Sequence, residues 1–209
     1  MKILIIGASQ GIGLCLFKQA LRAAHEVTAL ARNPGRLGIM HKQARVLKGD
    51  ILDMNDVKEA VRGQDGVCIT IGIKPIFKPV MVFSEGTRNV VNVMKNSGVK
   101  KLICVTGIGA GDSKGHGGFF YDQIFKPLFL KTIYQDKDQQ EEIVQASDLE
   151  WELVRPGFLT NGLRTGRYRV LTDLSGIKAG KISREDVADY ILKEFAEMRN
   201  VRKSLLLTY

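Results

Sequence analysis

Cysteine is scarce in this chain, and the three cysteines that occur are far apart. Cys15, Cys68 and Cys104 all lie in apolar stretches, with no C-x-x-C pair and no cysteine–histidine cluster. Spacing of this kind argues against a disulfide framework and against the usual zinc sites. The sequence therefore predicts buried, reduced thiols and no metal site.

Long hydrophobic runs are also missing. No stretch approaches the about 18 uncharged apolar residues that a membrane-spanning helix needs. The apolar run Ile3–Ile6 has only four residues, ends at Gly7 and is followed by no cleavage-like site, unlike a signal peptide. We interpret it as a first strand, and we expect a cytoplasmic protein with no membrane span.

The chain has no concentrated basic tract, although its formal net charge is +9. Its lysines and arginines are scattered, and neither an arginine-rich run nor zinc-finger spacing occurs. This distribution disfavours nucleic-acid binding. Excess positive charge also attracts phosphorylated cofactors and anionic substrates, which is the interpretation we prefer.

Short β-branched runs alternate with helical patterns along the chain. The runs predict strands at residues 2–6, 26–31, 44–48, 66–71, 101–106, 152–155 and 204–208. Helical spacing predicts helices at residues 12–24, 55–62, 80–96, 135–146 and 184–198, with Asn55 and Ser183 as caps. Strands separated by helices imply parallel βαβ units with right-handed crossovers. The sequence therefore predicts an α/β fold, a doubly wound parallel sheet of the Rossmann type in three layers.

No linker, repeat or low-complexity tract interrupts this alternation, so we expect one domain over residues 1–209. Residues 107–131 differ, because they are first glycine-rich and then aromatic, and with residues 157–180 they are expected to form a small substrate cap. The aromatic part has three interpretations: a lid over a flat ligand, a helix packed on the core or a dimer, and a membrane-docking surface flanked by Lys126 and Lys131.

The first strand runs into a turn with three glycines in seven residues, and a helix follows. The turn is Gly7, Ala8, Ser9, Gln10, Gly11, Ile12 and Gly13. Gly7 permits a tight turn, Gly11 lets the backbone approach a pyrophosphate, and Gly13 allows the helix to pack closely on the strand. A helix N-terminus offers free N–H groups and a positive dipole end. The strand–turn–helix context therefore predicts dinucleotide binding.

The second strand ends at Ala31-Arg32, where an NAD-preferring site carries an acid for the ribose 2′-hydroxyl. No acid is present, and a guanidinium grips a 2′-phosphate with two hydrogen bonds. We therefore expect NADP(H) to be preferred over NAD(H).

Two later strand ends contribute further candidate cofactor contacts. Asp50 and Ile51 follow the third strand, where an acid contacts the adenine amino group and an aliphatic side chain packs on the ring. An ordinary turn is an equally good interpretation of Asp50. Thr70, Ile71 and Gly72 end the fourth strand, where the sheet edge approaches the middle of the cofactor.

Together these features resemble the short-chain dehydrogenase/reductase superfamily, and more narrowly its atypical NAD(P)H-binding branch of NmrA-like proteins and biliverdin-IXβ/flavin reductases. The resemblance covers nearly the whole chain. It is carried by residues 7–13, 31–32, 49–53, 99–103, 149–157 and 182–188. It implies that Pro156, Gly157 and Phe158 lie near the nicotinamide.

The chain departs from the superfamily at the catalytic residues. Typical members carry Tyr-x-x-x-Lys, in which lysine lowers the pKa of the tyrosine. Here Lys137 lies three residues after Tyr134 rather than four. The residue four positions after Tyr121 is Phe125 rather than lysine. The usual serine is replaced by Thr106.

Hydride transfer to a flavin, bilin or quinone needs no dedicated protein acid, because the acceptor accommodates the charge. The sequence therefore predicts an NADPH-dependent oxidoreductase of a small, flat, conjugated acceptor, active as a monomer or homodimer. Candidate catalytic side chains are Thr106, Tyr121 and His116. The alternative is a non-catalytic NADP(H)-binding regulatory or redox-sensing protein. A sugar-nucleotide epimerase fits less well, because such chains are longer and keep the Tyr/Lys pair.

Overall fold

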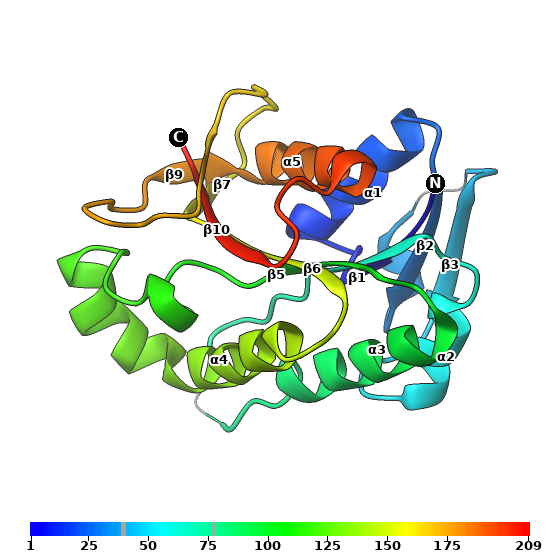
Figure 1. Cartoon of the computed structure of the whole chain (residues 1–209), viewed down its shortest axis with the longest axis horizontal. Helices are drawn as coiled ribbons and strands as arrows, with labels where there is room; N and C mark the ends of the chain where they lie inside the picture. The colour runs from blue at the N-terminus through cyan, green and yellow to red at the C-terminus, as the bar shows by residue number, and fades with distance from the viewer. Residues whose placement is uncertain (39–40, 77) are drawn as a thin grey trace.

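An eight-stranded sheet forms the centre of the computed structural model, which describes residues 1–38, 41–76 and 78–209 (Figure 1). The strand order is β3-β2-β1-β4-β5-β6-β10-β8. The strands are β1 (Lys2–Ile6), β2 (Glu26–Ala31), β3 (Ala44–Lys48), β4 (Gly66–Ile69), β5 (Lys101–Val105), β6 (Glu150–Pro156), β8 (Arg169–Leu171) and β10 (Lys203–Thr208). All neighbours are parallel except β10 and β8. The predicted doubly wound sheet is confirmed, with one antiparallel edge strand added.

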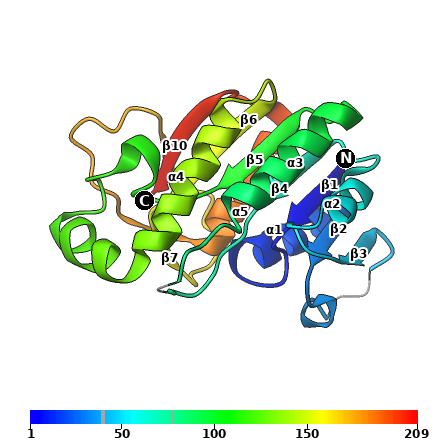
Figure 2. The ribbon, with the colours of Figure 1, turned by 90° about the horizontal axis from the view of Figure 1, so that it is seen from below.

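Helices cover both faces of this sheet and complete the three layers (Figures 1 and 2). On one face lie α1 (Gly11–Arg22) and α5 (Arg184–Glu197), which pack against each other. On the other lie α2 (Met54–Val61), α3 (Ser84–Ser97) and α4 (Lys131–Gln145). None of the helices in the described ranges is long and apolar enough to cross a bilayer.

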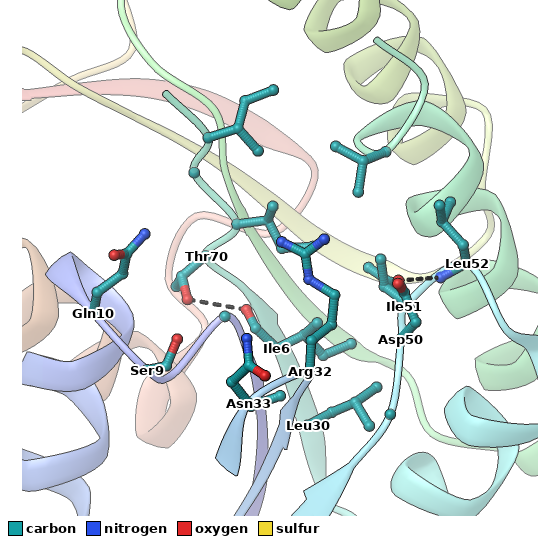
Figure 3. Close-up of a pocket in the computed structure, with 17 residues that line it drawn as sticks. Ile6, Ser9, Gln10, Leu30, Arg32, Asn33, Asp50, Ile51, Leu52 and Thr70 are labelled. Atoms are coloured by element: carbon teal, nitrogen blue, oxygen red, sulfur yellow. Dashed lines mark hydrogen bonds between the residues drawn. The ribbon is translucent and has the colours of Figure 1, made fainter. Parts of the chain in front are cut away.

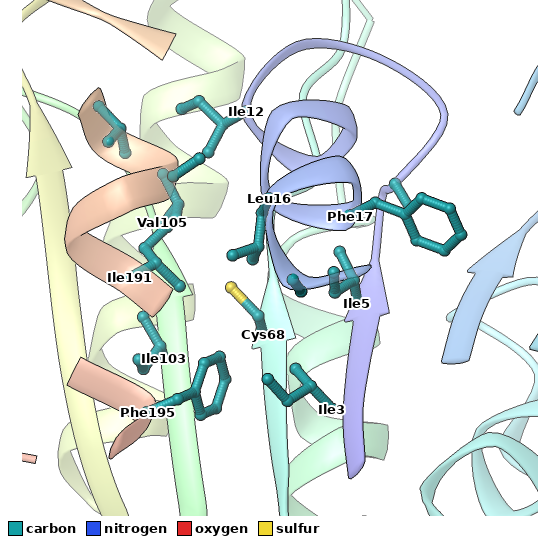
Figure 4. Close-up of a cluster of buried hydrophobic side chains, with 14 of the residues drawn as sticks. Ile3, Ile5, Ile12, Leu16, Phe17, Cys68, Ile103, Val105, Ile191 and Phe195 are labelled. Atoms are coloured by element: carbon teal, nitrogen blue, oxygen red, sulfur yellow. The ribbon is translucent and has the colours of Figure 1, made fainter. Parts of the chain in front are cut away.

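The alternation of side chains along β1 explains the two-sided core. Ile3 and Ile5 pack toward α1 and α5 (Figure 4). Leu4 and Ile6 belong to the cluster on the opposite face of the sheet. Both sets are fully or nearly fully buried. A parallel strand covered on both faces must be apolar at every position, which is why these strands appear in the sequence as continuous runs. Each such side chain contributes roughly 1.5–3 kcal/mol when buried.

The strand order places a crevice between β1 and β4. After β1 the chain builds β2 and β3 on one side, and it then returns to build β4, β5 and β6 on the other. The loops leaving the carboxyl ends of β1 and β4 therefore diverge. Open α/β sheets bind ligands at such a switch point.

Three predicted helix starts are wrong by a few residues. Helix α4 begins at Lys131 rather than at residue 135. Asp53, not Asn55, caps α2, because its carboxylate accepts the N–H groups of Asn55 and Asp56. Helix α3 begins at Ser84 rather than near residue 80. Its first N–H groups, those of Phe83 and Ser84, donate to Asp136 of α4. Because Asp136 belongs to a distant segment, no local sequence pattern predicts this start of α3.

Residues 107–131 form irregular structure at the end of the molecule opposite β3 (Figures 1 and 2). After the short turn η2 (Gly111–Ser113), the π-helix η3 (Tyr121–Leu130) leads directly into α4. Residues 157–180 lie beside them, since the Ala179 N–H donates to the His116 carbonyl. A two-stranded parallel sheet of β7 (Phe158–Thr160) and β9 (Lys181–Ser183) completes this end.

A buried carboxyl on β6 makes the stability of the fold depend on pH. Glu152 is fully buried and accepts a 2.5 Å hydrogen bond from Tyr190, while its second oxygen has no hydrogen-bond partner within the described residues. Burial raises the pKa of Glu152 to about 8. The unfolded chain releases this proton near pH ~4.3. The folded state is therefore penalised increasingly as pH rises between these two values.

Glu152→Gln is expected to remove this pH dependence, because glutamine resembles the protonated acid. Chemical unfolding between pH 5 and 8 should show a smaller fall in the unfolding free energy than in the wild type, by on the order of a kcal/mol or more. Glu150→Gln, on the same strand but partly exposed, is the matched control. If the unfolding free energy of Glu152→Gln fell with pH as steeply as that of the wild type, Glu152 would not be the source of the pH dependence.

Candidate functional site

Two adjoining cavities occupy the crevice at the carboxyl ends of β1 and β4. The first cavity has a volume of about 250 Å³ and lies over the Gly7–Gly13 turn, β2 and the loop after β3. The second cavity, about 690 Å³, lies over the ends of β5 and β6 and beside α4. Both are lined by Gln10 and by the segment Thr70–Ile73. One elongated ligand can therefore extend from the first cavity into the second.

The Gly7–Gly13 turn has the geometry of an anion cradle. Gly7 and Gly11 adopt φ angles of +96° and +58°, which side chains rarely allow. A Cβ on Gly13 would lie under 3.0 Å from the Gly7 carbonyl oxygen and the Thr70 hydroxyl. Helix α1 starts here without a side-chain cap and with no acid in its first turn. Its N–H groups and positive dipole end are thus available to an anion.

Arg32 and the loop after β3 form the far wall of the first cavity (Figure 3). Arg32 is exposed and extends between Thr70 and Ile51. The Leu52 N–H donates to Asp50 Oδ1 at 3.1 Å, so Asp50 serves as a turn residue as well as lining the cavity. Asn89 of α3 donates to the carbonyls of Ile51 and Leu52, which fixes this loop.

Most residues predicted to bind the cofactor line one of the two cavities. In the first are Gly7, Ser9, Gln10, Arg32, Asp50, Ile51, Thr70, Ile71 and Gly72. In the second are Gln10, Gly11, Ile12, Thr70, Ile71, Gly72, Thr106, Pro156, Gly157 and Phe158. Ala8 and Gly13 line neither: Ala8 is part of the core, and Gly13 packs under Gly7.

The three candidate catalytic side chains are separated by the structure. Thr106 and Tyr121 line the second cavity, whereas His116 is not among its lining residues. The Nδ1 atom of His116 lies 2.8 Å from the carbonyl oxygen of Ile177. His116 therefore joins residues 107–131 to residues 157–180.

A buried network holds Thr106 in place. The Thr106 hydroxyl donates to Glu141 at 2.6 Å, and the Lys137 ammonium donates to the Thr106 carbonyl at 2.7 Å. Glu141 also accepts two hydrogen bonds from Arg155, which is almost completely buried and pairs with Asp112 as well. The Thr106 proton thus points into the protein and away from the cavity.

A pair of phenols, those of Tyr121 and Tyr134, also lines the second cavity. Tyr134 donates to the Ile108 carbonyl at 2.9 Å, and the oxygens of Tyr121 and Tyr134 are 2.8 Å apart. Tyr121 must then donate to Tyr134, so the protons of both phenols are used inside the protein. The Tyr121 ring also packs edge-on against Phe158, with centroids 5.3 Å apart. Burial raises the pKa of both tyrosines.

Tyr134 and Lys137 both line this cavity, although their spacing does not match Tyr-x-x-x-Lys. Residues three apart lie on one face of a helix, so this spacing alone predicts that the two side chains lie close together. Burial lowers the pKa of Lys137 to about 8. Its ammonium is bonded to the Thr106 carbonyl, so it positions the end of β5.

Sequence reasoning missed the cationic side chains at the mouth of the second cavity. Lys74 and Arg184 both line it, and Arg184 donates to Asn161 at 2.8 Å. Lys74 follows Gly72, and Arg184 begins α5. No local sequence pattern at either position predicts that the side chain is directed toward the cavity.

Comparison with known proteins shows the family of this chain. A family model for NAD(P)H-binding proteins matches residues 7–197. Two Bacillus subtilis proteins are each 26% identical: YwnB, over 96% of this chain and 93% of its own length, and the uncharacterized sugar epimerase YhfK, over 100% and 94%.

Solved structures share the fold. ChuY, an anaerobilin reductase from Escherichia coli O157:H7, has a TM-score of 0.82 at 24% identity, over 100% of this chain and 97% of its own. A short-chain dehydrogenase/reductase from Veillonella parvula, in complex with NADP, has a TM-score of 0.84 at 18% identity, over 100% and 94%. Because the family model covers most of the sequence, the chain belongs to the NAD(P)H-binding family.

Proposed function

We propose that the protein is an NADPH-dependent reductase that transfers a hydride to a flat, conjugated acceptor such as a flavin, bilin or quinone. The observation that carries the proposal is that the two cavities adjoin, because Gln10 and the segment Thr70–Ile73 line both of them. A dinucleotide in the first cavity would present its reactive end to the second. The second cavity has the volume of a typical small-molecule site.

The residues of the first cavity fit this cofactor. The uncapped start of α1 and the close-packed glycines suit the pyrophosphate, and the exposed Arg32 suits a 2′-phosphate. Ile51 and Asp50 flank the space for adenine, while Pro156–Phe158 flank the space for nicotinamide. Bound NADPH supplies two electrons and one hydrogen as a hydride and leaves as NADP⁺.

The walls of the second cavity suit a flat acceptor. They are mostly apolar or aromatic, and they include Phe83, Val105, Ile108, Tyr121, Leu130, Ile133, Phe158 and Leu159. The protons of Thr106, Tyr121 and Tyr134 are all used within the protein. An acceptor that takes its proton from solvent needs none of them. The anaerobilin reductase activity of ChuY, a protein of the same fold, is consistent with this choice.

Arg32→Asp is expected to shift cofactor preference from NADPH toward NADH, because a carboxylate repels the 2′-phosphate and accepts from the 2′-hydroxyl. The ratio of the two dissociation constants should change by on the order of tenfold or more, about 1.4 kcal/mol. Fluorescence titration with each cofactor measures it. Arg167→Asp, an exposed loop arginine outside both cavities, is the control. An unchanged ratio in the Arg32 variant would defeat the NADP(H) assignment.

Tyr121→Phe is expected to keep kcat within about threefold of the wild type, whereas Tyr121→Ala should raise the KM of the acceptor by roughly tenfold. The reason is that the ring contacts the acceptor and the phenol proton is not required. Stopped-flow oxidation of NADPH with flavin, biliverdin and quinone acceptors measures both constants. Tyr168→Phe, whose phenol is bonded to Asp189, is the control.

Two other outcomes would overturn parts of this proposal. Loss of kcat in Tyr121→Phe would make the phenol a proton donor. Tight NADPH binding without oxidation by any acceptor would contradict reductase activity, and it would favour the regulatory or redox-sensing alternative.

A further inference from the structure

The surface of η3 and the two residues before it is unusually apolar. Phe119, Phe120 and Leu128 are 79%, 68% and 60% exposed, and Ile124, Phe125 and Phe129 are also exposed. No residue of η3 is buried. Clustered exposure of this kind marks an interaction surface, whereas single exposed apolar residues need no explanation.

Ligand binding in the second cavity does not account for these side chains. Of the whole segment, only Tyr121 and Leu130 line that cavity. Phe125 packs on the outer side of Tyr121, with centroids 6.1 Å apart, and on Phe129 at 5.3 Å. The aromatic segment is therefore divided: Tyr121 faces the cavity, and the other four aromatic rings face solvent.

Other exposed apolar side chains lie at the second cavity and beside the start of α4. Phe158 and Leu159 are exposed and line that cavity, and Phe158 contacts Tyr121. Ile76 is also exposed, and its carbonyl accepts a hydrogen bond from the Thr132 hydroxyl at the start of α4. We call these exposed apolar residues the apolar rim: Ile76, Phe119, Phe120, Ile124, Phe125, Leu128, Phe129, Phe158 and Leu159.

The charges around the apolar rim are positive. Residues 72–80, 117–131 and 157–163 contain four lysines, Lys74, Lys78, Lys126 and Lys131, and a single acid, Asp122. Lys126 is half-buried and donates to the Gly109 carbonyl, so the exposed lysines are Lys74, Lys78 and Lys131, and they outnumber the single acid. Exposed aromatic and aliphatic side chains bordered by lysines are typical of a segment that lies in the interface of an anionic membrane.

A second copy of the chain fits this surface less well. A twofold contact brings the same patch of both subunits together, so two positively charged patches would face each other. Lipid headgroups with negative charge complement them instead. The absence of a spanning helix in the described part of the chain is compatible with docking at the surface.

We propose that the apolar rim docks on an anionic lipid membrane, with the aromatic side chains among the acyl chains and Lys131 at the headgroups. The mouth of the second cavity then opens toward the bilayer. Docking does not depend on the chain's being a reductase.

Vesicle flotation tests the proposal. The full-length protein should float with mixed phosphatidylcholine and phosphatidylglycerol vesicles, far less with phosphatidylcholine alone, and less at high salt. Phe119→Ser combined with Phe120→Ser should abolish most of the binding. Lys131→Glu should weaken it by on the order of tenfold, because it reverses one charge at the headgroups. Val201→Ser changes an exposed apolar residue in the turn before β10, and this variant should float like the wild type.

NADPH titration of every variant establishes that the fold and the first cavity are intact. The proposal is overturned if the wild type does not float with the anionic vesicles, or if the rim variants float like the wild type. It is also overturned if sedimentation shows a dimer that the phenylalanine variants dissociate, since a second copy then covers the surface.

Discussion

The close approach of α1 to the ends of β1 and β4 is the contact on which the rest of the site depends. Gly13 lies against the Gly7 carbonyl and the Thr70 hydroxyl, in a space too small for any side chain. The Thr70 hydroxyl in turn donates to the Ile6 carbonyl at 3.0 Å. Because of this packing, the uncapped helix start points into the crevice at the switch point of the sheet.

A second constraint operates at the far end of the crevice. Arg155 and Glu141 are both buried and joined by two hydrogen bonds, and Glu141 also holds the Thr106 hydroxyl. A buried charge pair is tolerated only when its remaining hydrogen-bonding groups are satisfied. Asp112 and Lys137 complete the network, so β5, β6 and α4 meet in one arrangement. One side of the second cavity is therefore held in place by buried hydrogen bonds. Tyr121 and Leu130 of η3 also line this cavity.

Sequence reasoning succeeded where the determinants are local. The bounds of β1, β2 and β3 match the prediction, because each is an apolar run ended by turn residues. It failed where contacts with distant segments determine where an element begins or whether it forms. Asp136 sets the start of α3 from α4, and β8 has only three residues, which pair with β10 alone within the described strands. Tyr134 and Lys137 were found but set aside, because a family spacing was applied in place of helix geometry.

A crystal structure of the NADPH complex tests the central claim most directly. We expect the pyrophosphate against the N–H groups at the start of α1 and the 2′-phosphate at Arg32. The nicotinamide C4 should lie within about 4 Å of the walls of the second cavity, a contact distance. Phosphates placed away from the Gly7–Gly13 turn, or a nicotinamide directed out of the second cavity, would contradict the account.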